Sequence, residues 1–356
     1  MKILILARGG VPFHNNSIEE RPLGGTETAV INLARGLHER GHAVRVISTH
    51  PNPPVSLPLY LPAAGLRDLG PIDVLLVVRD WRDLFVPVKT KSRFYWTGDS
   101  YDQIAAIGVG DLRVQKYLDA FFAVSSWHAE TFSKFSGVAP DKFFVLGNGI
   151  DSKLFAGEET RDSKRLIYTS TPYRGLKHLL QIFPRIKSIV PEASLHIFSG
   201  FNVYQGVEPD RVALAEWANL KEAFLKMPGV LVNENILQKD LAREFMRSAI
   251  LAYPNTFEET SCITAMEAQA GGAVVVSSNK GALPETVGEA GILVEGKPGT
   301  DAYDFAFVRA VTDLLGDQSR LASLSQLGKK RARELFDWSN VIARFEEFSK
   351  EKFNIS

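Results

Sequence analysis

Short apolar runs alternate with helical patterns along the chain. The first apolar run, Lys2–Ala7, is followed by a loop and then by Thr26–Arg40, in which apolar residues recur on one helical face. A second apolar run, Val44–Ser48, comes next. This order of strand, loop, helix and strand is typical of a parallel sheet covered by helices, so we predict an α/β fold built from doubly wound, Rossmann-like units.

The same pattern continues in both halves of the chain. In the first half it predicts strands at Val74–Val78, Arg93–Trp96, Ala120–Val124 and Phe143–Leu146, and in the second half at Leu166–Thr169, Ser194–Phe198, Val230–Val232, Ile250–Tyr253, Ala273–Ser277 and Gly291–Val294. Helices are predicted at Lys177–Val190 and Lys239–Ser248, and Pro184 should kink or divide the first of these. Trp338–Phe353 reads as an amphipathic terminal helix.

A chain of 356 residues favours two domains. The polar stretch Gly157–Lys164 is the expected linker. We therefore predict an N-terminal domain over residues 1–160, a C-terminal domain over residues 161–336, and a terminal helix in residues 337–356 that crosses back to the first domain. Two such domains would face each other across a central cleft, where ligands usually bind.

The composition excludes several classes of protein. Lys+Arg and Asp+Glu balance at 41 each, so a nucleic-acid partner is not expected. Cys262 is the only cysteine, which excludes an intramolecular disulfide and fits a reducing compartment. No run of about 18 apolar residues suggests a membrane span. The N-terminus fits a first strand better than a signal peptide, so we expect a cytoplasmic protein.

Residues 258–272, EETSCITAMEAQAGG, combine a helical run of small residues with carboxylates at Glu259 and Glu267. Because N–H groups at a helix start favour an anion, a phosphate could bind at Cys262–Thr264. Glu267 would then lie about 7–9 Å further along the axis, where a carboxylate could accept hydrogen bonds from a ribose. The spacing equally allows Glu259 to cap the helix and Glu267 to face solvent.

The wider stretch Asn255–Val287 resembles the E-x7-E region of retaining, family-4 type glycosyltransferases (glycosyl transferase group 1), which have the GT-B fold. The resemblance implies that Glu259 contacts the hydroxyls of a donor sugar and Glu267 the nucleotide ribose. It also implies backbone contacts to the sugar and diphosphate, from Ser261, Cys262, Ile263 and Thr264. The family often has Gly-Phe-Gly where this chain has Thr-Ser-Cys, so the sugar pocket is expected to differ.

Three other segments resemble the same family. Asn148-Gly149-Ile150-Asp151 is similar to its junction before the second domain, although the motif also fits an ordinary turn. Arg174 matches a cation that neutralises the leaving diphosphate, and Lys177 could replace the second cation of the pair or simply face solvent. Gly24 and Gly25 resemble a loop near the donor phosphates, or are a flexible helix start.

Further candidates follow other strands. Asp99 ends Trp96-Thr97-Gly98-Asp99 and is the candidate for positioning the acceptor or accepting its proton, or is a turn residue. Asn235, Ile236 and Leu237 lie where relatives contact the base. The basic and aromatic run Arg79–Arg93 is either a solvated face or a surface that docks an anionic or lipid-linked acceptor at a membrane.

The sequence contains no D-x-D pair and no cluster with metal-ligand spacing, so no metal site is predicted. The resemblance implies a retaining hexosyltransferase that moves a sugar from a nucleotide sugar, UDP-linked by analogy and with UDP-glucose as first candidate, to a saccharide or lipid-linked saccharide. Three alternatives stay open: a UDP-sugar 2-epimerase on the same fold, a non-catalytic nucleotide-sugar-binding subunit, and a pyridoxal-phosphate phosphorylase with Lys177 as the Schiff base.

Overall fold

The computed structural model describes residues 1–204 and 210–354 and contains two compact units. Unit 1 comprises residues 1–18, 24–149 and 338–356, and unit 2 comprises residues 19–23 and 150–337. Each unit is a parallel sheet with helices packed on it. No helix in the described ranges is both long and apolar enough to cross a membrane.

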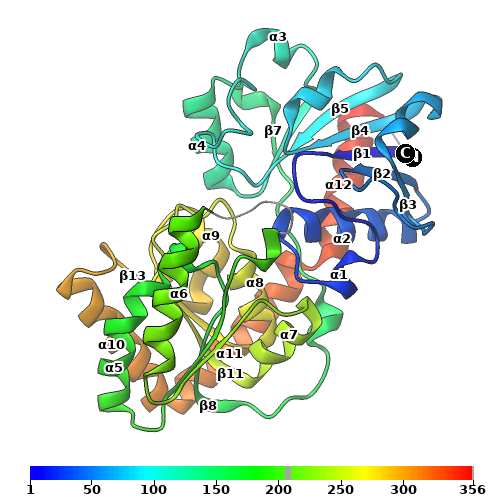
Figure 1. Ribbon diagram of the computed structural model, residues 1–356. Helices are drawn as coiled ribbons and strands as arrows, with labels where there is room; N and C mark the ends of the chain where they lie inside the picture. The colour runs from blue at the N-terminus through cyan, green and yellow to red at the C-terminus, as the bar shows by residue number, and fades with distance from the viewer. Residues whose placement is uncertain (205–209, 355–356) are drawn as a thin grey trace. The chain divides into compact units, whose positions relative to one another are not determined.

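Unit 1 has a seven-stranded sheet in the order β3-β2-β1-β4-β5-β6-β7 (Figure 1). Its strands are β1 (Lys2–Ala7), β2 (Ala43–Ser48), β3 (Leu59–Leu61), β4 (Ile72–Val78), β5 (Thr90–Trp96), β6 (Ala120–Ala123) and β7 (Phe143–Val145). The α-helices of the first 149 residues are α1 (Ser17–Glu20), α2 (Gly25–Glu39), α3 (Leu112–Gln115) and α4 (Ser126–Ser136). The strand order reverses between β1 and β4, because successive crossovers run in opposite directions from β1.

The last helix, α12 (Trp338–Phe353), packs in unit 1 although it comes from the C-terminus. It runs beside α2, as Figure 1 shows for the red and blue helices. A side chain at Gly36 would come within 2.0 Å of Ile342, so the glycine permits the close approach of the two helices. Phe345 is fully buried, and its ring lies 5.7 Å from that of Phe122 on β6.

Unit 2 has a six-stranded sheet in the order β10-β9-β8-β11-β12-β13, and its strand order reverses between β8 and β11. The strands are β8 (Asp162–Tyr168), β9 (Ser194–Phe198), β10 (Val230–Asn233), β11 (Ser248–Tyr253), β12 (Val274–Ser278) and β13 (Gly291–Val294). The α-helices are α5 (Leu179–Ile189), α6 (Arg211–Leu225), α7 (Gln238–Arg247), α8 (Ile263–Gly271), α9 (Leu283–Val287), α10 (Asp301–Gly316) and α11 (Gln318–Arg331).

The structure corrects three details of the sequence interpretation. Pro184 does not divide its helix, since α5 continues through it with Ile182, Phe183 and Ile186 buried, and this packing outweighs the lost backbone hydrogen bond. The expected linker ends earlier, because β8 begins at Asp162. The short strand β3 was not predicted because prolines flank it on both sides.

We expect Phe345→Ala to lower the free energy of unfolding of unit 1 by about 3–5 kcal/mol, because it leaves a cavity between α12 and the sheet. Urea denaturation of the whole chain would measure the loss. Glu351→Ala changes an exposed residue of the same helix and is the matched control. A loss below about 1 kcal/mol for Phe345→Ala would show that α12 contributes little to unit 1.

Candidate functional site

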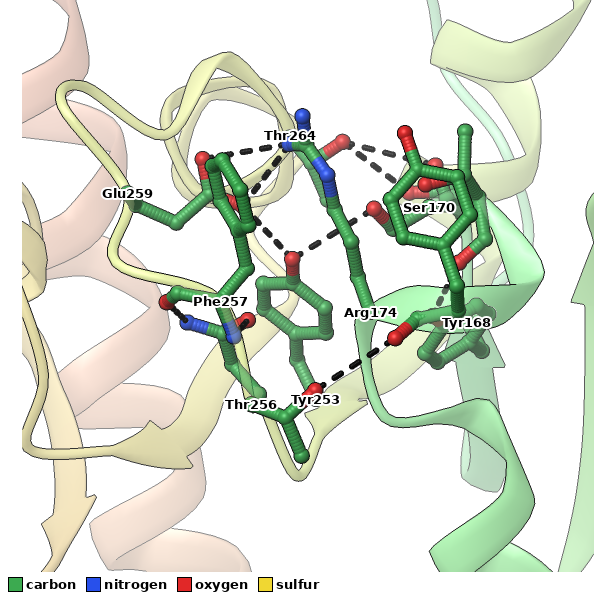
Figure 2. Close-up of polar contacts among 12 residues, drawn as sticks. Tyr168, Ser170, Arg174, Tyr253, Thr256, Phe257, Glu259 and Thr264 are labelled. Atoms are coloured by element: carbon green, nitrogen blue, oxygen red, sulfur yellow. Dashed lines mark hydrogen bonds and ion pairs between the residues drawn. The ribbon is translucent and has the colours of Figure 1, made fainter. Parts of the chain in front are cut away.

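The main polar cluster of unit 2 lies at the carboxyl ends of β8 and β11, where the strand order reverses. Open α/β sheets bind ligands at this kind of position, because the loops that follow the two strands separate there. Arg174 ends a 3-10 helix (Pro172–Arg174) in the loop after β8, and Glu259 lies in the loop after β11. Figure 2 shows their side chains pointing toward each other from these two loops.

Glu259 is buried and has two strong hydrogen-bond partners. Nη1 of Arg174 lies 3.0 and 3.2 Å from its two carboxylate oxygens. The hydroxyl of Tyr253, the last residue of β11, donates to Oε1 at 2.6 Å. The guanidinium of Arg174 also lies over the ring of Phe257, 4.4 Å from its centroid. These contacts fix the carboxylate and the guanidinium side by side at the mouth of the site (Figure 2).

Two glycines allow the loops to come this close. Gly175 has a left-handed φ of 108°, and a Cβ there would lie 2.0 Å from the carbonyl oxygen of Pro254. Gly281 has a φ of 59°, and a Cβ there would lie 2.5 Å from the carbonyl oxygen of Glu259. The same carbonyl accepts a hydrogen bond from the N–H of Ala282 at 2.7 Å. Any larger residue at either position would displace the backbone that carries the polar pair.

Helix α8 begins next to this pair. Cys262 is its N-cap residue and provides no side-chain cap, so the first turn offers backbone N–H groups at the positive end of the helix dipole. Burial, followed by the charge of Glu259, raises the pKa of the Cys262 thiol, so this cysteine is not a thiolate. The hydroxyls of Thr264 and Thr169 lie 3.5 Å apart and join the start of α8 to the end of β8.

Glu267 lies one to two turns further along α8 and is 7% exposed, which excludes the interpretation that it faces solvent. Nε2 of Gln238, at the start of α7, donates to its Oε1 at 2.8 Å. Burial raises the pKa of Glu267 to about 7, and the hydrogen bond from Gln238 opposes part of that shift. A buried carboxyl group with a single neutral partner is costly for folding alone, which is typical of a binding residue.

Three buried polar atoms in the stretches that follow β10 and β11 have no hydrogen-bond partner within the described part of the chain. They are Oγ of Ser261, Oδ1 of Asn235 and Oε1 of Gln238. Buried polar groups are almost always paired, so the unsatisfied atoms of Ser261, next to the N-cap of α8, and of Gln238, which contacts Glu267, indicate positions that a polar ligand could complete. Ile236 packs against the core of unit 2, and Leu237 precedes α7.

The remaining predicted residues of unit 2 lie around this cluster. Lys177 is exposed on the 3-10 turn Leu176–His178, directly after Gly175. Burial, and then the charge of Lys177, lower the pKa of the neighbouring His178. Thr260 and Ser261 are buried with Cys262, so this stretch, where the family often has glycines, packs its side chains inside the unit.

The other predicted residues lie in unit 1. Gly24 is the N-cap residue of α2 and Gly25 its first residue, and a Cβ on Gly24 would lie 2.7 Å from a carboxylate oxygen of Glu27. Asp99 follows β5 and accepts from Nε of Arg79 at 2.8 Å, and its carbonyl oxygen lies 3.0 Å from Nε2 of His128. Burial lowers the pKa of His128 to about 4, so this histidine is neutral and has a structural role.

The run Arg79–Arg93 does not present a row of unpaired cations. Arg79 pairs with Asp99, and Arg82 pairs with Asp80 at 2.9 Å. Arg93 donates to the backbone carbonyls of Leu84, Val86 and Val88. Most of the positive charge in this run is therefore used inside unit 1, which favours the interpretation as a solvated face over that as a docking surface for anions.

The sequence reasoning did not single out Tyr253, Gln238, Phe257 or Arg79. Tyr253 ends a uniformly buried strand, and a hydroxyl at the last position of a switch-point strand is a usable signal for a site residue. The other three become visible only when the loops fold together. Among residues 1–204 and 210–354, no group of three or more His, Cys, Asp or Glu side chains is placed to hold a metal ion.

Comparisons with known proteins agree with this architecture. Residues 163–317 match the family described as "Glycosyl transferases group 1". Over these residues, which include Arg174, Glu259 and Glu267, the chain is similar to the group 1 glycosyltransferases. It is 27% identical over 239 residues to an MMP alpha-(1->4)-mannosyltransferase of Mycolicibacterium hassiacum, a match that covers 65% of this chain and 54% of the relative. It is 25% identical to an alpha-maltose-1-phosphate synthase of Mycolicibacterium smegmatis, covering 63% of this chain and 60% of that one.

Solved structures share the whole fold of this chain at low identity. Sucrose-phosphate synthase from Thermosynechococcus elongatus covers 100% of both chains with a TM-score of 0.74 at 17% identity. HepE of Anabaena, solved in complex with UDP-glucose, covers 98% of both chains with a TM-score of 0.71 at 15% identity. The predicted resemblance to this family and the predicted GT-B fold are confirmed. In sequence, the chain aligns with 54–60% of the length of the two curated mycobacterial relatives named above.

The buried Glu267 should make stability depend on pH. Its pKa is raised in the folded state from 4.5 to about 7, so the folded chain binds more protons than the unfolded chain between these values. Stability should therefore fall by roughly 3 kcal/mol as the pH rises through this window. Glu267→Gln should remove most of this fall in urea denaturation curves, whereas Glu216→Gln, at an exposed position of α6, should keep it. Identical pH profiles for the two variants would contradict the assignment.

Proposed function

We propose that this chain transfers a hexosyl unit, with retention of anomeric configuration, from a UDP-linked sugar to a saccharide or lipid-linked saccharide acceptor. UDP-glucose is the first candidate donor. The observation that carries the proposal is the pair of Arg174 with the buried Glu259 beside the start of α8, with Glu267 buried further along the same helix. One arrangement thus offers a place for an anion between two carboxylates that can accept hydrogen bonds from hydroxyls.

Unit 2 would bind the donor. The backbone N–H groups at Ser261–Thr264, the guanidinium of Arg174 and the exposed Lys177 would neutralise the diphosphate. A guanidinium has five N–H donors, so Arg174 can serve the diphosphate and Glu259 together. Glu259 would accept hydrogen bonds from hydroxyls of the transferred sugar, and Tyr253 would hold the carboxylate in place.

Glu267 would accept from the ribose hydroxyls, and its link to Gln238 orients it for this. The unsatisfied oxygen atoms of Asn235 and Gln238 would receive donors of the nucleoside, at the loop formed by Asn235, Ile236 and Leu237. The complex of HepE with UDP-glucose, on the same fold, supports the choice of UDP for the first test.

Unit 1 would bind the acceptor. Asp99 would orient the acceptor hydroxyl, and the backbone at Gly24 and Gly25 would lie near the donor phosphates. In the transfer step the bond from the sugar's anomeric carbon to the diphosphate breaks, and the acceptor oxygen forms its bond to that carbon on the same face. The acceptor's proton passes to the departing diphosphate oxygen. Positioning and fixed charges supply most of the rate in this scheme, which requires no protein nucleophile and no metal ion.

Removing the charge of Glu259 should lower the rate of sugar transfer to the acceptor and also the rate of donor hydrolysis by water. We expect Glu259→Gln to lower kcat/KM for release of UDP from UDP-glucose by about a hundredfold, because the sugar and Arg174 lose their carboxylate partner. Glu258→Gln is the matched control, since the side chain of Glu258 is 61% exposed and only its contact with Lys280, at 4.0 Å, would change. Equal rates for the two variants would contradict the proposal, as would tight binding of UDP with no turnover by the wild type.

The identity of the donor can be read from thermal unfolding with UDP-, GDP- and ADP-linked glucose and mannose. A donor at a hundredfold excess over its Kd should stabilise unit 2 by about 2.7 kcal/mol, and we expect the UDP-sugar to give the largest shift. The shift should persist in EDTA if the diphosphate is held by Arg174, Lys177 and α8 alone. A larger shift with a GDP- or ADP-sugar would show that the donor carries guanine or adenine instead of uracil. Loss of the shift in EDTA would show that donor binding needs a metal ion.

A further inference from the structure

A cavity of about 580 Å³ lies open to solvent at the carboxyl ends of β1, β4 and β5 in unit 1. Its lining comes from Gly9 after β1, from Arg79, Asp80 and Arg82 after β4, and from the segment 99–105 after β5. The strand order of this sheet reverses between β1 and β4, so the cavity occupies the switch point of unit 1. Its volume falls in the range of small-molecule sites, about 300–1,000 Å³.

The backbone at one edge of this cavity is held in a costly conformation. Arg79 has a φ of 68°, in the left-handed region that costs a residue with a side chain about 1–2 kcal/mol. Its N–H donates to the carbonyl of Trp96 at 3.0 Å, and its carbonyl accepts from the hydroxyl of the buried Tyr95 at 2.8 Å. Backbone strain of this kind gathers at ligand sites, and here it directs the Arg79 side chain to the cavity.

The opposite wall is equally well fixed. The indole N–H of Trp81 donates to the carbonyl of Ile107 at 3.0 Å, and a Cβ on Gly108 would lie 2.9 Å from the Trp81 ring. Oε1 of Gln103 accepts from the N–H of Ser100 at 2.8 Å. These contacts hold the segment that carries the remaining lining residues, so the cavity is preformed rather than assembled around a ligand.

The charges that line the cavity identify the ligand it suits. Each guanidinium already has a carboxylate partner within the lining, Asp99 for Arg79 and Asp80 for Arg82. Asp102 adds a third carboxylate, so the two cations and three carboxylates among the described lining residues give a formal charge of −1. An incoming phosphate or carboxylate would meet excess negative charge and compete with existing ion pairs.

Uncharged hydroxyl groups meet no such obstacle. The carboxylates accept hydrogen bonds from hydroxyls, and the guanidinium and amide N–H groups donate to them. Hydrogen bonds to charged groups are stronger than those between neutral groups. Ile104, which is 84% exposed, and Ala105 provide an apolar patch on the same wall for the C–H face of a sugar ring. The cavity therefore combines both kinds of surface that a neutral saccharide presents.

We propose that this cavity binds an uncharged sugar ring of the acceptor and selects against acceptors that carry a phosphate or carboxylate at that ring. The inference rests on the proposed transferase function and names the class of acceptor. Asp102 is the residue that sets the selectivity. The other two carboxylates of the lining pair with its two guanidiniums, so the charge of Asp102 is the one left unbalanced within the lining.

The test compares methyl glucoside with methyl glucuronoside, and methyl mannoside with methyl mannuronoside, as ligands of the whole chain. Each pair shares its ring and differs by one carboxylate. Saturation-transfer NMR titrations give the two dissociation constants without requiring turnover. We expect the neutral hexosides to bind at least about tenfold more tightly than their charged partners, and Asp102→Lys to shrink that ratio by about tenfold or more.

Asp141→Lys makes the same change of charge at an exposed position of unit 1 outside the cavity lining, and it should leave the ratio unchanged. Tighter or equal binding of the hexuronosides, binding of neither ligand, or the same shift in both lysine variants would overturn the inference. Failure of donor hydrolysis is a separate outcome, since it would reject the proposed transferase function while the binding ratio still decides what the cavity accepts.

Discussion

The reversal of strand order in each sheet is the constraint on which both candidate sites depend. At β8/β11 in unit 2 and at β1/β4 in unit 1, successive crossovers leave in opposite directions. The loops at the carboxyl ends therefore separate there, and polar side chains can face one another without filling the gap. The pair Arg174–Glu259 forms at the first switch point and the pair Arg79–Asp99 lines the cavity at the second.

The two units use these pairs in opposite electrostatic settings. In unit 2 the buried Glu259 is balanced by Arg174, and the start of α8 and the exposed Lys177 add positive potential, which suits an anion. In unit 1 both guanidiniums of the cavity are neutralised within the lining and a carboxylate remains. Within the proposed transferase, this contrast would direct the diphosphate of the donor to unit 2 and the neutral ring of the acceptor to unit 1.

Several groups in these sites are costly for folding alone. Glu267 is buried with one neutral partner, the buried Oγ of Ser261 and Oε1 of Gln238 lack hydrogen-bond partners within the described ranges, and Arg79 has a left-handed backbone. Each would be replaced at little structural loss if stability alone were selected. The rest of each unit, with its apolar sheet and close-packed helices, supplies the stability that these positions lack.

The sequence by itself determined the α/β class, most strands, the terminal helix and the resemblance to the family, because period-two and period-3.6 patterns and the spacing of Glu259 and Glu267 are local properties of the chain. It also indicated Arg174 and Asp99 as candidates. It could not show that Glu267 is buried against Gln238, that Tyr253 and Arg174 hold Glu259, or that the positive charge of Arg79–Arg93 is spent on internal partners. Most of those facts depend on which loops the strand order brings together. The hydrogen bonds Arg79–Asp99, Gln238–Glu267 and Arg174–Glu259 join residues 20, 29 and 85 positions apart and leave no periodic trace in the sequence.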